Sequence, residues 1–126
     1  MHRHRLERQV ARVKLHLTPE ILRAAYEYLR ACPPFNRWKL PQADEVEFHV
    51  TRHTDRRGDC EATVDGHCVR ISAALIGRTS SLMETLAHEM IHVRLDRKGV
   101  RSHHGRDFQR CAAQVCRYHG FDLKLF

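Results

Sequence analysis

The five residues His88-Glu89-Met90-Ile91-His92 have the types and spacing of a metal-dependent hydrolytic site. Residues four apart lie on the same face of a helix, so both imidazoles can bind one zinc ion. Glu89 is rotated by about 100° from His88, which suits a general base acting on a metal-bound water better than a third ligand. Composition alone would give about 0.06 such pentapeptides in a chain this rich in histidine. The alternative is a helix with two surface histidines.

A catalytic zinc usually has three protein ligands and one open position for water, so a third ligand is needed. Leu95 and Lys98 occupy the positions where the metzincin pattern requires Gly and His, which excludes that family. His103 and His104 are the candidates. The residues four, seven and eleven positions after His104 would share its helix face, and all three are of types that are usually buried: Phe108, Cys111 and Val115. The same steps from His103 reach Asp107, Arg110 and Gln114, a solvated face.

We therefore choose His104 as the third ligand, with His103 as a surface neighbour. Asp107 is a candidate for orienting a ligand imidazole by accepting its free N–H. Tyr118, His103 and Arg101 are candidates for stabilising the oxyanion, and the sequence does not rank them.

The hydrophobic pattern predicts a small α+β domain. Basic helical periodicity covers residues 5–17, and Thr18 followed by Pro19 marks a second helix start. Alternating segments at 46–51, 60–64 and 69–73, with a hairpin at Asp65-Gly66, predict a small, mostly antiparallel three-stranded sheet packed with helices. A helix follows from a capping box at Ser81 and Glu84 to about residue 98, and a last helix covers 104–119. The strand at 69–72 could hold an extended peptide by strand addition.

The chain of 126 residues is expected to form one domain, residues 1–126. Five cysteines without a Cys-x-x-Cys pair indicate reduced, mostly core thiols. Neither a signal peptide nor an apolar run long enough for a membrane span occurs, so we expect a cytoplasmic or nucleoid-associated protein.

The net charge of +7 favours a polyanionic partner such as DNA. Residues at the end of the metal helix and on the last helix are candidate contacts: Arg94, Arg97, Lys98, Arg106 and Arg110. The alternative is a solvated charged face. Phe35 and Trp38 could stack on bases, although we favour a core role for both.

The pentapeptide, followed by His104-Gly105-Arg106-Asp107-Phe108, resembles the SprT-like (Spartan-type) zinc metallopeptidase domain. The resemblance covers about residues 18–119 and is strongest over 60–119, where Cys68-Val69-Arg70-Ile71-Ser72 also fits. It implies a zincin-like minimal fold, one zinc ion per chain on His88, His92 and His104, and Glu89 as base. It also implies protein substrates bound or crosslinked to DNA. We expect no C-terminal zinc ribbon, so DNA binding would rest on the basic surface of the domain.

Two further functions remain as alternatives. One is a basic nucleic-acid-binding regulatory protein with a structural or vestigial metal site. The other is a small metallopeptidase that acts on regulatory proteins without DNA. Glu89 favours an enzyme, because a purely structural site has no use for a carboxylate beside its metal.

Overall fold

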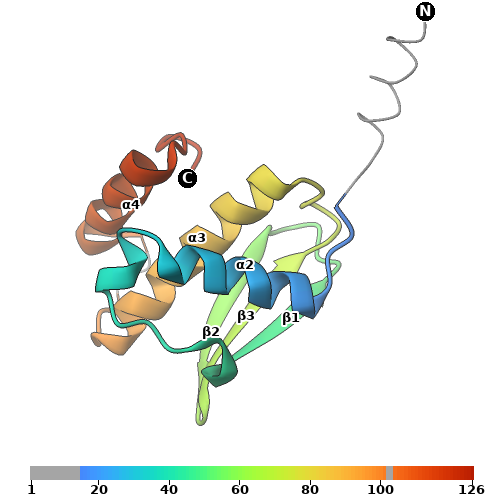
Figure 1. Ribbon diagram of the computed structural model, residues 1–126, viewed down its shortest axis with the longest axis horizontal. Coiled ribbons are helices and arrows are strands. Elements are labelled where there is room, and N and C mark those ends of the chain that lie inside the picture. The colour runs from blue at the N-terminus through green and yellow to red at the C-terminus, as the bar shows by residue number, and fades with distance from the viewer. Residues whose placement is uncertain (1–14, 102–103) are drawn as a thin grey trace, which may run out of the picture.

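The computed structural model describes residues 15–101 and 104–126. Three helices, two short 3-10 turns and three strands follow one another in this part of the chain (Figure 1). Their bounds are α2 Pro19–Ala31, η1 Phe35–Arg37, η2 Ala43–Glu45, β1 Val46–Thr51, β2 Gly58–Thr63, β3 Gly66–Ser72, α3 Thr79–Arg97 and α4 Arg106–His119. The predicted basic helix at 5–17 lies almost entirely outside the described residues.

The sheet has the order β1-β3-β2, with β3 in the centre. β2 and β3 form the predicted antiparallel hairpin, whereas β1 pairs with β3 in parallel, so the sheet is mixed. The α+β class and the three-stranded sheet are thus confirmed. The prediction that the strand at 69–72 holds a peptide is wrong, because both edges of β3 are already paired.

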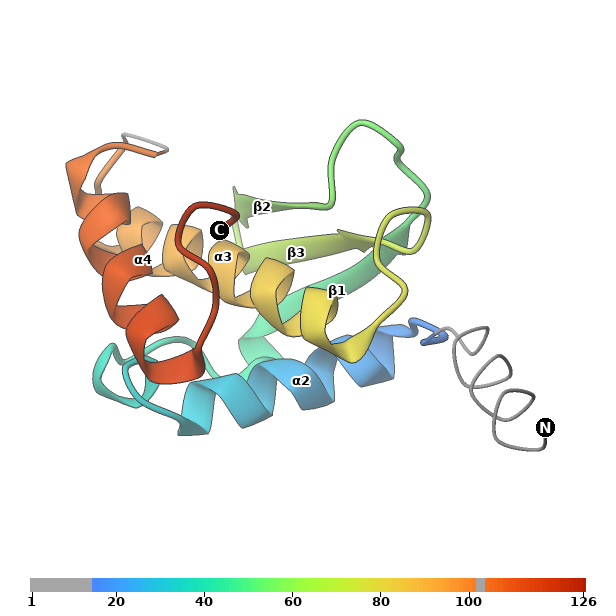
Figure 2. The same cartoon turned by 90° about the horizontal axis from the view of Figure 1, so that it is seen from above.

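The helices lie to one side of the sheet, with α3 next to it (Figure 2). Alternation explains this layering: Val69 and Ile71 of β3 are fully buried against the helices, while Cys68 and Arg70 point to the opposite side. We call that opposite side, away from α3, the outer face. α3 is buried around most of its circumference, with Leu86, Met90 and Val93 inaccessible to solvent.

Helix ends follow local chemistry, with one correction. The hydroxyl of Thr18 accepts a hydrogen bond from the Ile21 amide at the start of α2, as predicted. The predicted capping box at Ser81 is wrong, because α3 begins at Thr79 and the Ser81 hydroxyl donates to the Arg78 carbonyl. Gly120 ends α4 with a left-handed φ of 75°, which glycine adopts without strain.

Gly58 lets β2 lie close to α3. A Cβ atom there would be 2.9 Å from the carbonyl oxygen of Arg70 and 3.1 Å from the Cγ2 of Thr85. Any larger residue would therefore push the strand away from the helix. Within the described residues, no helix is long and apolar enough to cross a membrane.

Candidate metal centre

Two imidazoles project from the same face of α3. The Nε2 atoms of His88 and His92 lie 3.3 Å apart, as the four-residue spacing predicts. Apolar residues fix the orientation of the helix by packing it against the sheet and α4. Both histidines are only half-buried, which leaves their Nε2 atoms accessible from a cleft.

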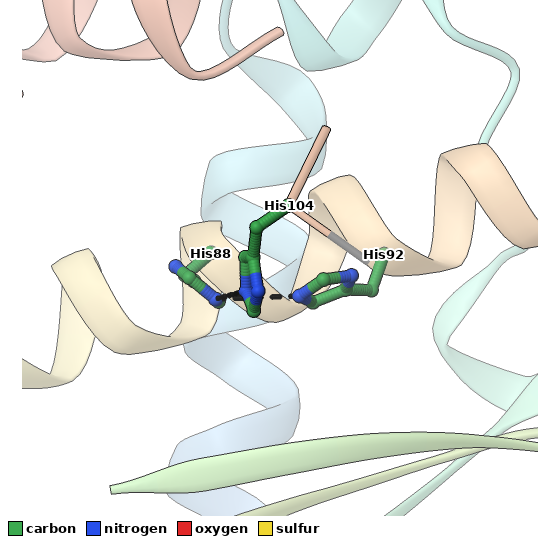
Figure 3. A group of neighbouring side chains, drawn as sticks. All are labelled: His88, His92 and His104. Atoms are coloured by element: carbon green, nitrogen blue, oxygen red, sulfur yellow. Dashed lines mark hydrogen bonds between the residues drawn. The ribbon is translucent and has the colours of Figure 1, made fainter. Parts of the chain in front are cut away.

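The third imidazole comes from the turn just before α4. The Nε2 of His104 is 3.2 Å from that of His88, and all three side chains converge (Figure 3). We call His88, His92 and His104 the histidine triad. Phe108, one turn into α4, is buried and its ring centroid lies 4.8 Å from those of His88 and His104 and 4.9 Å from that of His92. This phenyl ring therefore holds all three imidazoles in place.

The spacing of the triad fits a metal ion. Nitrogens bound at about 2.0–2.1 Å to one tetrahedral zinc lie roughly 3.3 Å apart, close to the 3.2 and 3.3 Å observed. The ligating atoms of all three residues lie within 4.8 Å of one another. Three neutral nitrogen donors leave one tetrahedral position open for water or substrate.

The tautomer of His88 is fixed from its far side. Its Nδ1 donates a hydrogen bond to the main-chain oxygen of Phe126, at 2.8 Å, so Nε2 keeps the free lone pair that a metal needs. Burial lowers the pKa of His88, and the charge of His104 lowers it further against the opposing effect of this hydrogen bond. Both the low pKa and the hydrogen bond favour the metal-binding form.

Glu89 points into the protein beside the triad and is only 5% exposed. Burial raises the pKa of its carboxyl to about 8, with a further contribution from the negative charge of Asp59. A buried carboxylate with a pKa near neutrality is suited to accept and return a proton.

Two hollows meet at the triad. The larger, about 500 Å³, extends along β2 and ends near Val100 and Arg101. The smaller, about 240 Å³, is bounded by Arg57 and by the C-terminal residues Leu125 and Phe126. His88, Glu89 and Gly58 line both, so an extended molecule could cross from one hollow to the other past the triad.

The other predicted residues of the site fall in different places. Arg101 is exposed and lines the larger hollow. Asp107 is exposed in the first turn of α4. Tyr118 lies in a separate hollow with Trp38, so the structure does not bring it to the triad. His103 lies outside the described residues.

Several residues of the site carried no signal in the sequence. Arg57 directly precedes β2, Gly58 is the first residue of that strand, and Phe126 lies 38 residues after the histidine it orients. The Asp65-Gly66 hairpin was visible, but neither periodicity nor motif spacing tells which strand borders α3.

The basic residues separate into packed and free ones. Arg94 stacks over the Trp38 ring, with its Cζ 4.4 Å from the ring centroid, and Arg97 donates to the carbonyl of Lys39. Neither guanidinium is wholly free for phosphate, so both fit the prediction of a nucleic-acid contact poorly. Exposed positions remain for Lys98, Arg106 and Arg110. Phe35 is a core residue, as favoured, and Trp38 packs against the core.

Comparison with protein-family models gives a match over most of the chain. The SprT-like family model matches residues 26–124, which include both halves of the histidine motif. This family is generally associated with metallopeptidase-like function. No curated protein matches the chain.

Proposed function

Since the chain belongs to the SprT-like family, we propose that it is a zinc-dependent endopeptidase that acts on proteins associated with or crosslinked to DNA. The observation that carries the proposal is the convergence of three imidazole nitrogens beside a buried glutamate. His88, His92 and His104 would hold the metal, and Glu89 would be the general base.

A zinc ion bound by the triad would activate a water molecule and polarise the scissile carbonyl. Glu89 would accept the proton of the attacking water and deliver it to the leaving amine nitrogen. Its burial keeps bulk water from competing for that proton. Arg101 and Arg57, in the two hollows, are the candidates for stabilising the oxyanion.

The substrate would lie along β2. This strand is an edge of the sheet, and Gly58, Cys60 and Ala62 line the larger hollow. An extended peptide could pair with its free backbone groups and pass the triad into the smaller hollow. β2 thus takes the role that the sequence had suggested for β3.

DNA recognition would rest on exposed cations near the cleft. Arg101 lines the cleft, and Lys98, Arg106 and Arg110 lie on the neighbouring ends of α3 and α4. Contact with phosphates would release counterions, so DNA binding should weaken steeply with salt. A DNA-bound protein would thereby be brought next to the triad.

The deciding experiment combines metal content with proteolysis. Wild type should carry about one zinc per chain at the triad and cleave a DNA-binding protein faster when DNA is present. His104→Ala should lose that zinc and the activity, whereas His16→Ala, which changes an exposed histidine far along the chain, should retain both.

The regulatory alternative predicts another outcome. If the chain binds DNA with equal affinity with and without the metal, and cleaves no protein, the metal is structural or vestigial. Proteolysis at the same rate with and without DNA would instead support a peptidase that acts on proteins without a DNA link.

A further inference from the structure

A second group of metal-ligating side chains lies on the outer face of the sheet. Glu47 and His49 of β1 are exposed, and they alternate with Val46 and Phe48, which face the core. Cys68 of β3 is the register partner of Glu47 across the parallel pair. These three residues, the outer-face cluster, are separated from the histidine triad by the sheet itself.

The geometry of the cluster is compact. One ligating atom from each residue lies within 4.8 Å of the other two. The Nε2 of His49 is 3.5 Å from the Oε2 of Glu47, and the Cys68 side chain lies almost entirely out of contact with solvent. Residues two apart on one strand and a register partner on the next share a face at close range. The arrangement therefore follows from the backbone and does not require unusual side-chain conformations.

The electrostatics of the surrounding face favour a cation. Arg70 is the nearby positive charge, and it is engaged on the β2 side of β3 by Asp59 at 2.8 Å and Glu61 at 3.8 Å. Its charge is matched there, so the carboxylate of Glu47 on the β1 side adds net negative charge at the cluster. Exposure of Glu47 and His49 also gives an ion a path to the thiol.

The donor set selects a class of metal. A thiolate, an imidazole and a carboxylate are all zinc ligands, and a thiolate disfavours the hard ions magnesium and calcium. Three ligands on two strands leave room for a water as the fourth.

We propose that Glu47, His49 and Cys68 form a second metal site, which binds a thiophilic divalent cation of the zinc type independently of the histidine triad. Because β1 is an edge strand that pairs with β3 alone among the strands of the described residues, a bound ion would add a second link between this strand and the sheet. Binding to the folded state alone would then stabilise the protein as the metal concentration rises. The cleft and its chemistry are not involved, so the proposal stands or fails separately from the proposed peptidase.

Cobalt(II) distinguishes the two sites by spectroscopy. A thiolate ligand gives a sulfur-to-cobalt charge-transfer band in the near ultraviolet, and three imidazoles give none. Titration of the full chain with cobalt should produce this band, and it should persist in His104→Ala. Cys68→Ser should abolish it, whereas Cys32→Ser, at the half-buried end of α2, should retain it.

A surface variant removes the concern that Cys68→Ser disturbs folding. His49→Ala changes an exposed ring, and it should weaken the cobalt affinity of the band-producing site at least about tenfold, as loss of a ligand or its support does. The proposal is overturned if no band develops, if the band survives Cys68→Ser, or if His49→Ala leaves the affinity unchanged. A band that disappears in Cys60→Ser instead would assign it to the thiol beside the histidine triad.

Discussion

The histidine triad and the outer-face cluster lie on opposite sides of one small sheet and differ in how they are built. Two ligands of the triad come from α3 and the third comes from the turn before α4, while Phe108 of α4 and the C-terminal Phe126 support them. The cluster comes from two strands whose parallel register brings positions 47 and 68 together.

The surroundings of the two sites suit different roles, a catalytic one for the triad and a structural one for the cluster. The triad has three nitrogen donors, an open cleft and a buried carboxylate next to it. The cluster has a thiol among its donors, lies on an open surface, and uses its own carboxylate as a candidate ligand. A metal at the first position would lie beside a general base, whereas a metal at the second would join β1 to β3.

The largest expected effect tests the role of Glu89. Glu89→Gln keeps the size and burial of the side chain but cannot accept a proton. We expect peptidase activity to fall by about 10²–10⁴-fold, with zinc content unchanged. Glu47→Gln, on the outer face, is the matched control and should leave activity intact. Cleavage at the wild-type rate by Glu89→Gln would contradict the mechanism.

The metal-free protein should reveal the cost of burying Glu89. Its pKa is raised to about 8 in the folded state, so the folded protein holds this proton more tightly than the unfolded chain. Stability from this group is therefore complete below the unfolded pKa of the carboxyl and declines as the pH rises towards 8. Glu89→Gln should be as stable as wild type near pH 4.5 and more stable near pH 8, by on the order of 3 kcal/mol.

Chemical denaturation of the metal-free proteins at several pH values measures this difference. Histidine titration is common to both proteins and cancels in the comparison. Glu47→Gln, which replaces a carboxylate that is 72% exposed and not buried, is the control variant. A constant gap between wild type and Glu89→Gln across this range would show that the burial of Glu89 has no such cost.

These two sites also show what sequence can and cannot predict. The sequence alone identifies His88, Glu89 and His92 as a candidate metal site, because their relative positions depend only on the helix repeat within five consecutive residues. His104 was chosen as the start of a buried helical stripe. It in fact precedes α4 in a turn, and Phe108, the first member of that stripe, packs against it. Alternation and the Asp65-Gly66 turn signal also predicted the three strands and their hairpin.

The contacts that sequence missed are long-range. The parallel pairing of β1 with β3 requires a crossover that alternation alone does not reveal. The hydrogen bond from His88 to Phe126 joins residues that are 38 positions apart in the sequence. The outer-face cluster brings together residues about 20 positions apart. Neither has a local pattern, because tertiary packing places the partners.

Removal of residues 122–126 should separate the two metal sites. It deletes the main-chain oxygen that holds the His88 tautomer and one wall of the smaller hollow. We expect zinc affinity at the triad to fall by about 10–100-fold, while the cobalt–thiolate band stays. Phe126→Leu keeps the main-chain oxygen and should retain most of the affinity. Equal losses in both variants would assign the effect to the phenyl ring.

The smallest effect concerns charge on the outer face. Arg70→Gln removes the cation beside the cluster and its contact with Glu61, while Asp59 keeps its ion pair with Arg56. Cobalt affinity measured by the thiolate band should rise about threefold at low salt, because one repulsive charge at this range is worth less than 1 kcal/mol in water. The gain should shrink at 1 M salt, where the screening length is about 3 Å. Zinc affinity at the triad should change less than cobalt affinity at the cluster, because Arg70 lines neither of the two hollows beside the triad. An equal rise in metal affinity at both sites, or a rise that does not depend on salt concentration, would mean that Arg70 acts through the structure of the sheet and not through its charge.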